Sequence, residues 1–169
     1  VIGVPRTLDG LDLAQLEQIV VQSRPKAIFI NTVLQNPSGA SLSLASAFRL
    51  LQLADRQGLW VIEDDIYRDL APSGAPCLAA MEGLNRVISI SGFSKTISPM
   101  LRVGFIAAHR DVLAELARTK MAVGLTSSEV AERVAANILV EGHYDRHVGF
   151  LVEKLHAAHE RVAARMLDA

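Results

Sequence analysis

Three short motifs of this chain carry an amide, a carboxylate with a phenol, and an amine followed by a guanidinium. They are Asn36-Pro37-Ser38-Gly39, Asp64-Asp65-Ile66-Tyr67 and Phe93-Ser94-Lys95, with Arg102 seven residues after the lysine. An amine in a partly apolar site can stay uncharged and nucleophilic, and a carboxylate can hold a cationic ring nitrogen. An arginine with nearby hydroxyl groups can hold a phosphate through charge-assisted hydrogen bonds. Together these groups predict a site for a phosphorylated heterocycle that carries an aldehyde.

Pyridoxal phosphate is a cofactor that needs all of these groups at once. Its aldehyde suits the amine of Lys95, and its pyridine nitrogen suits the carboxylate of Asp64. Its phenolic oxygen suits Asn36 and Tyr67, and its phosphate suits Arg102 together with a serine hydroxyl. We therefore expect a pyridoxal phosphate site.

Short apolar runs alternate with longer amphipathic segments along the chain, which is the pattern of an α/β fold. The predicted strands are residues 1–4, 27–30, 59–62, 87–90 and 103–108. Helical periodicity predicts helices at about residues 13–20, 44–54, 111–122, 126–141 and 144–167. In open α/β sheets the chemistry lies beyond the carboxyl ends of the strands, and each of the three motifs follows a predicted strand.

Capping residues predict where several of these helices begin and end. Gly58 is expected just beyond the end of the second helix, and Pro25 beyond the end of the first. Thr126 and Glu129 have the spacing of a capping box, which predicts the start of the fourth helix, and Gly142 closes it. The last helices follow one another with no strand between them, so we expect the sheet domain to end near residue 125.

The composition is that of a globular domain, and it argues against several classes of function. The 169 residues are 50% hydrophobic and 21% charged, enough to fill a core. With 17 Lys and Arg against 18 Asp and Glu, the balance argues against nucleic-acid binding by this segment. The single cysteine, Cys77, excludes an internal disulfide and indicates a reducing compartment. We expect a cytoplasmic protein with no membrane span, because no apolar run approaches about 20 residues.

The three motifs, in this order, resemble those of the fold-type I, aspartate-aminotransferase-like enzymes that use pyridoxal phosphate. That family has Asn-Pro-Thr/Ser-Gly, then Asp-x-x-Tyr, then a Ser-Lys-(x)6-Arg-x-Gly stretch, which here runs from Ser94 to Gly104. The resemblance implies a three-layer α/β/α large domain with a mixed, mostly parallel sheet, in which residues 103–108 form an antiparallel strand. It also implies a homodimer, and an Asn36-Pro37 peptide bond that is often cis in the family.

The resemblance assigns roles to residues of the three motifs. Lys95 would form a lysine aldimine with the cofactor, and would then move the Cα proton of an α-amino acid as general base and acid. Asp64 would pair with the protonated pyridine nitrogen, while Asn36 and Tyr67 would bind the phenolate oxygen. Lys95, Asp64 and Tyr67 are therefore the predicted catalytic residues.

The phosphate-binding residues implied by the resemblance are Arg102 and Ser94. Three residues before the lysine the family often has Ser or Thr on the phosphate, whereas this chain has Gly92. Ser91 or the backbone is the expected substitute, and a weaker grip on the phosphate is the alternative.

A finer resemblance is to the aminotransferase-like effector domains of MocR-type regulators of the GntR family. It rests on residues 62–67, 92–96 and 141–147. It implies a sensor domain, with DNA contacted only through a winged helix-turn-helix domain that precedes this segment. Two alternatives remain open: a stand-alone amino acid aminotransferase of the aminoadipate or aromatic type, and a degenerate fold without catalysis.

The segment is expected to be part of a longer chain. Residues 1–125 are predicted to be the central part of the cofactor-binding large domain, and residues 126–169 to be helices leading toward a small domain. In the family, the phosphate loop and the ring-stacking aromatic lie upstream, and the arginine for the substrate carboxylate lies downstream. We therefore do not expect this segment alone to be active.

Two metal-site interpretations were weighed against these assignments. The acidic run Glu63-Asp64-Asp65 could bind Mg²⁺, but no P-loop or second acidic cluster accompanies it. His143 and His147 have the spacing of helical metal ligands, but the sequence offers no third ligand. We expect no metal site, and we expect Cys77 to be an inert, partly buried thiol.

Overall fold

The computed structural model describes residues 1–7, 10–124 and 126–167. The chain divides into two compact units. The first unit contains Val1–Gly92 and Gly104–Thr126, and the second contains Phe93–Val103 and Ser127–Ala169. The loop that carries Lys95 thus belongs to the unit formed by the last two helices.

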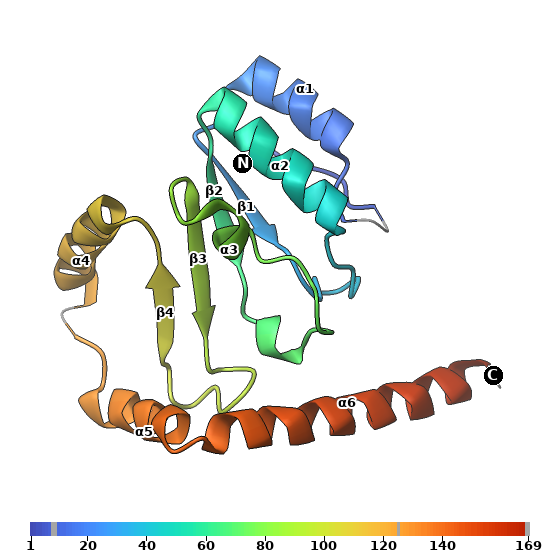
Figure 1. Ribbon diagram of the computed structural model, residues 1–169, viewed down its shortest axis with the longest axis vertical. Coiled ribbons are helices and arrows are strands. Elements are labelled where there is room, and N and C mark those ends of the chain that lie inside the picture. Colours follow the sequence, from blue (N-terminus) through green and yellow to red (C-terminus); the bar gives the residue numbers. More distant parts are fainter. Residues whose placement is uncertain (8–9, 125, 168–169) are drawn as a thin grey trace. The chain divides into compact units, whose positions relative to one another are not determined.

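The elements of the first unit alternate between helix and strand, as the sequence predicts (Figure 1). In chain order they are α1 (Leu13–Ser23), β1 (Ala27–Asn31), α2 (Leu44–Gln57), β2 (Trp60–Asp64), the 3₁₀ turn η1 (Arg68–Leu70), α3 (Leu78–Glu82), β3 (Val87–Gly92), β4 (Gly104–Ala107) and α4 (Arg110–Gly124). The strands form one sheet in the order β1-β2-β3-β4. The first three strands are parallel, and β4 is antiparallel to β3, so the prediction of a mixed, mostly parallel sheet is confirmed.

Strand side chains alternate between the two faces of this sheet. Val61 is fully buried, and Val87 lies beside it in register on β3. Their face packs against helices α1, α2 and α3 through a cluster of buried aliphatic residues that includes Leu16, Leu50 and Leu78. Full burial of a leucine contributes roughly 1.5–3 kcal/mol, so this one-sided core is the main source of the unit's stability.

Capping side chains and left-handed residues set the helix ends in the first unit. The Ser43 hydroxyl accepts a hydrogen bond from the Ser46 N–H at 3.1 Å, which fixes the start of α2. Gly58 ends that helix with φ of 67°, in the left-handed region, as predicted. Arg24 ends α1 with φ of 44°, directly before Pro25.

Residues 1–4 were expected to form a strand, and this expectation is wrong for the described chain. The run is apolar, but it pairs with no strand among residues 1–7 and 10–124. Apolar composition alone does not make a strand, because a strand also needs a neighbour for its backbone N–H and C=O groups.

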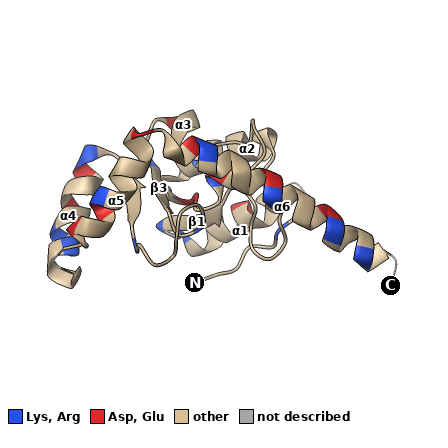
Figure 2. Cartoon of the chain, turned by 90° about the horizontal axis from the view of Figure 1, so that it is seen from below, with Lys and Arg blue, Asp and Glu red and all other residues tan. Residues whose placement is uncertain are grey.

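The second unit consists of the Phe93–Val103 loop with helices α5 (Glu129–Val140) and α6 (His143–Leu167). The helix α5 begins after Ser128, whose hydroxyl accepts from the Ala131 N–H, so the predicted capping box at Thr126 is wrong by two residues. Gly142, with φ of 67°, lies between α5 and α6. Charges of both signs are interspersed along α6 (Figure 2). None of the described helices has both the length and the apolar composition needed to cross a bilayer.

Candidate functional site

Asp64 lies at the carboxyl end of β2, where the sheet of the first unit ends. It is in register with Asn31 on β1 and with Ile90 on β3. Because side chains alternate along a strand, Asp64 projects from the face opposite to that of its buried neighbour Glu63. A hollow of about 210 Å³ is lined by Asp64, Ile66, Ile90 and Ser91. A carboxylate in an apolar hollow at the carboxyl edge of a parallel sheet is well suited to hold a cationic ring nitrogen.

The ends of β2 and β3 are tied together next to this hollow. The Asp65 N–H donates to the Ile90 carbonyl at 2.9 Å, and the Ser91 hydroxyl donates to the Asp65 carbonyl at 3.1 Å. The Asp64 carboxylate accepts from the Ile66 N–H at 3.3 Å. Asp64 and Ser91, both predicted site residues, are therefore brought together on adjacent strand ends, and Asp64 is held by the backbone of its own turn.

Asn36 and Tyr67 lie in loops that follow β1 and β2. The Asn36–Pro37 peptide bond is cis, as the resemblance implied. The loop closes through backbone hydrogen bonds from Gln35 N–H to the Ala40 carbonyl at 2.9 Å and from Gly39 N–H to the Gln35 carbonyl. Asn36 is exposed, whereas Tyr67 is half-buried at the start of η1.

A buried ion network lies on the other face of β2, directly behind Asp64. Glu63 is fully buried, and its two carboxylate oxygens accept from the Leu78 and Ala79 N–H groups at 2.8 and 2.9 Å. These are the first two residues of α3, so Glu63 satisfies amide groups that the helix itself cannot. The hydroxyl of Thr32, which follows β1, donates to the Glu63 carboxylate at 3.0 Å.

Arg68 supplies the positive charge of this network. Its Nη2 lies 2.7 Å from Asp65 Oδ1 and 3.5 Å from Glu63 Oε1. The same guanidinium donates to the carbonyls of Ala75 and Pro76 at 3.1 and 2.8 Å, which holds the loop before α3. Glu63 and Asp65, which flank Asp64 in the sequence, thus hold the Asp64–Tyr67 turn through their contacts with Arg68. Asp64 itself lines the hollow.

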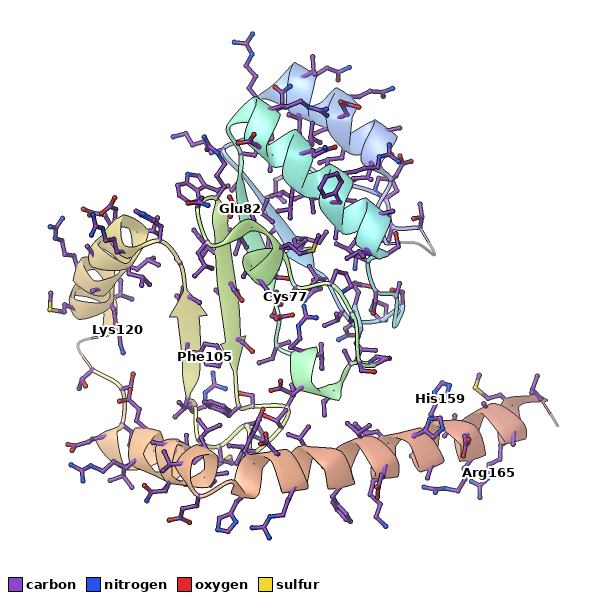
Figure 3. All side chains as sticks on the ribbon, viewed as in Figure 1. Cys77, Glu82, Phe105, Lys120, His159 and Arg165 are labelled. Carbon is purple, nitrogen blue, oxygen red and sulfur yellow. The ribbon has the colours of Figure 1, made fainter. Side chains whose placement is uncertain are left out.

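Burial changes the pKa of two groups in and beside this network, Glu63 and Cys77. It raises the pKa of Glu63, and the negative charge of Asp65 adds to that effect, while the bonds from α3 and Thr32 oppose it. Burial also raises the pKa of Cys77, which precedes α3 (Figure 3), in agreement with an inert thiol. Glu63, Asp65 and Cys77 bring possible metal-ligand atoms within 4.8 Å of one another. Arg68 already pairs with both carboxylates of this cluster, and Asp64, the middle residue of the acidic run, is not part of it.

In the second unit, Lys95 lies within a single turn of helical backbone. The Phe93 carbonyl accepts from the N–H groups of Ile97 and Ser98 at 2.8 and 3.0 Å, and closes the turn around the lysine. The Phe93 N–H donates to the Val103 carbonyl at 3.1 Å, which closes the base of the whole loop. Lys95 is exposed and Ser94 is half-buried. The turn thus carries the lysine on a backbone that is held by hydrogen bonds.

Arg102 and Gly104 end the motif with two unusual backbone positions. Arg102 is exposed and has φ of 54°, in the left-handed region. This conformation is uncommon for a residue with a side chain, although Arg24, Leu34 and Leu84 share it. Gly104 begins β4 opposite Gly92, and a Cβ at this position would lie 2.9 Å from the Ser91 carbonyl oxygen. The glycine of the Arg-x-Gly motif is therefore needed for close pairing of β4 with β3.

The residues present fit the donor set that pyridoxal phosphate requires. Asp64 offers a carboxylate in an apolar hollow, and Asn36 offers an amide at the same end of the sheet. Lys95 and Arg102 offer an exposed amine and an exposed guanidinium on one loop. A larger hollow of about 570 Å³, between residues 1–4, α1 and β1, is lined by none of the predicted site residues.

The sequence pattern identified the three motifs but not the residues that hold them in place. Glu63 was read only as part of an acidic run, yet it shares its strand face with the buried Val61. The period-2 pattern of β2 was a signal that Glu63 points into the core and needs partners. Tyr144 on α6 was also missed as a neighbour of the lysine loop, because nothing local in the sequence links residues 48 positions apart.

Comparison with known proteins identifies the family. The family described as Aminotransferase class I and II matches residues 5–169. The 2-aminoadipate transaminase of Thermus thermophilus is 33% identical over 171 residues, covering 98% of this chain and 42% of that protein. The HTH-type transcriptional regulator NorG of Staphylococcus aureus is 34% identical over 129 residues, covering 76% of this chain and 29% of that protein. The chain thus spans less than half the length of either relative.

Solved structures agree with this assignment. The α-aminoadipate aminotransferase LysN of Thermus thermophilus, solved with N-(5'-phosphopyridoxyl)-L-leucine, matches with a TM-score of 0.84 at 32% identity, over 90% of this chain and 40% of that one. The N-succinyldiaminopimelate aminotransferase of Mycobacterium tuberculosis matches with a TM-score of 0.85 at 26% identity, over 98% of this chain and 43% of that one. The sequence, the sheet and these matches together make the chain a member of the class I and II aminotransferase family.

Proposed function

We propose that this chain is the central part of a domain that binds pyridoxal phosphate and transfers the amino group of an α-amino acid. One observation carries the proposal. Asp64 at the end of β2 is in register with Ile90 on β3, and the chain runs on past the end of β3 at Gly92 to Ser94 and Lys95. The acid thus ends β2, and the amine comes three residues after the end of the neighbouring strand β3 in the sequence, which supports a cofactor with a reactive aldehyde and a basic ring nitrogen.

In the proposed reaction, each residue has a task that its position allows. Pyridoxal phosphate, when bound, supplies an electron-withdrawing ring that stabilises negative charge at the substrate Cα. The Lys95 amine would take the proton from that Cα and return it to the C4′ atom of the cofactor. The Asp64 carboxylate keeps the proton on the ring nitrogen, because an adjacent negative charge favours the cationic form.

The remaining site residues orient the cofactor. The Asn36 amide and the Tyr67 hydroxyl would donate hydrogen bonds to the phenolate oxygen of the ring. Arg102 and Ser94 bind the phosphate, and Ser91 is the candidate to replace the hydroxyl that Gly92 lacks. The exposed guanidinium on a left-handed backbone, and the serine at the end of β3, support these roles.

The test uses the full-length protein. We expect wild type to show the visible absorbance band of lysine-bound cofactor, and borohydride reduction to fix the cofactor mass on the Lys95 peptide. Lys95→Ala should lose both signals, whereas Lys120→Ala, on α4 (Figure 3), should keep them. A wild-type protein that takes up no pyridoxal phosphate would overturn the proposal and favour a degenerate fold.

For the whole protein we propose a MocR-type regulator in which this domain senses an amino acid or the cofactor. The similarity to NorG supports this role, and binding would act by favouring one of two protein conformations. The region before this segment should then be basic with a helix-turn-helix pattern, and the full-length protein should shift a DNA fragment from its own promoter in a gel.

The similarity to 2-aminoadipate transaminase supports a second candidate, a stand-alone aminotransferase. That protein would show steady turnover of an amino acid with a 2-oxo acid, and no gel shift. We further propose a cytoplasmic homodimer in either case. Light scattering of the full-length protein tests the dimer, and a mass equal to one chain would contradict it.

A further inference from the structure

The side chain of Tyr144 on helix α6 contacts the lysine loop. The Tyr144 hydroxyl donates to Thr96 Oγ1 at 3.1 Å, and Thr96 is 3% exposed. The Tyr144 ring also packs edge-to-face on Phe93, with ring centroids 5.9 Å apart and planes at 86°. All three residues belong to the second unit, so these contacts lie within one compact body.

These contacts fall on both sides of Lys95. Phe93 provides the carbonyl that closes the turn around the lysine, and Thr96 is the residue directly after it. A side chain that holds Phe93 by its ring and Thr96 by its hydroxyl restricts rotation of the backbone between them. Because this backbone carries Lys95, its conformation sets the direction in which the lysine side chain leaves the turn.

We propose that Tyr144 is a positioning residue for Lys95, acting through the hydroxyl of Thr96. The proposal rests on the function proposed above, because it needs Lys95 to react with the cofactor. The hydrogen bond fixes where the turn points the amine, and the aromatic contact fixes the turn itself. Loss of the bond should therefore slow the reaction of Lys95 without unfolding the domain.

The experiment compares conservative variants of the full-length protein loaded with pyridoxal phosphate. Tyr144→Phe keeps the ring on Phe93 and removes the bond, Thr96→Val removes the acceptor, and Thr96→Ser keeps it. His147→Asn, on the exposed side of α6, is the control. The rate at which an added amino acid displaces Lys95, followed by absorbance, is measured together with the midpoint of thermal unfolding.

The net free-energy contribution of an ordinary hydrogen bond corresponds to about a fivefold change in rate. We expect Tyr144→Phe and Thr96→Val each to slow displacement about fivefold, and the double variant to be no slower than either, because both remove the same bond. Thr96→Ser and His147→Asn should react as wild type. The recovery of the wild-type rate in Thr96→Ser, which keeps the acceptor hydroxyl, is a result that loss of stability alone would not produce.

The outcomes separate this proposal from the one on which it rests. If wild type takes up no cofactor, the proposed function fails. If wild type takes up cofactor but Tyr144→Phe reacts at the same rate, the function stands and the role of Tyr144 is refuted. If the slowing in the double variant is the product of the two single effects, Tyr144 does not act through Thr96, and the inference is likewise refuted.

Discussion

Replacing Arg68 by methionine tests whether the buried ion network behind Asp64 stabilises the fold. Methionine keeps much of the side-chain volume but leaves two buried carboxylates without their cation. The Glu63 side chain is 0% exposed and that of Asp65 is 8% exposed, so neither can recover its hydration. Removal of one partner from a buried pair costs about 3–5 kcal/mol. The Arg68 side chain is 23% exposed, so water already screens part of the interaction. We therefore expect the free energy of unfolding to fall by about 3 kcal/mol, the lower end of this range.

The assay is urea denaturation of the full-length protein, with the free energy of unfolding as the readout. Arg56→Met is the matched control, because Arg56 pairs with Glu17 at 3.3 Å on the surface, with side chains 59% and 56% exposed. That pair should contribute less than about 1 kcal/mol. A cost of Arg68→Met no larger than that of Arg56→Met would refute the reasoning.

Two further predictions concern protonation and strand pairing. Because burial raises the pKa of Glu63 above its ordinary 4.5, its contribution to stability is complete below that pH and is lost as pH rises through the raised pKa. The free energy of unfolding of wild type, relative to Glu63→Gln, should therefore fall as pH increases from about 4, and a difference that stays flat in urea titrations would contradict this. Gly104→Ala should lower the free energy of unfolding by about 1–3 kcal/mol, because the added Cβ would lie 2.9 Å from the Ser91 carbonyl oxygen. Gly149→Ala, with nothing within 4 Å, should leave the thermal midpoint unchanged or higher, and equal effects of the two substitutions would count against the close approach of β4 to β3.

The strands of the sheet could be predicted closely because burial on a sheet leaves a strong local pattern. The apolar runs at 27–30, 59–62 and 87–90 became β1, β2 and β3 with ends shifted by at most two residues. The residue pattern could not predict that β4 is antiparallel to β3. That expectation came from the family resemblance. Residues 1–4 show the limit of such patterns, since they are equally apolar but have no paired neighbour among the described residues.

The short elements could not be predicted, for a related reason. Helix α3 has five residues and η1 has three, which is too short for helical periodicity to appear. Both depend on contacts that are distant in sequence, from Glu63 to Leu78 and from Arg68 to Pro76. The motif residues were found because each has a distinctive type and spacing, whereas the residues that hold them in place have neither.

The Glu63 carboxylate accepts hydrogen bonds from the first two amide groups of α3. Because Glu63 belongs to β2, this short helix depends on that strand for its stability. A five-residue helix has too few internal hydrogen bonds to persist alone in water. The amide protons of Leu78 and Ala79 are bonded to a strand side chain, so they should resist exchange with deuterium until β2 itself opens. In an exchange experiment, this one-turn segment should then behave as part of the sheet and not as a fraying surface helix.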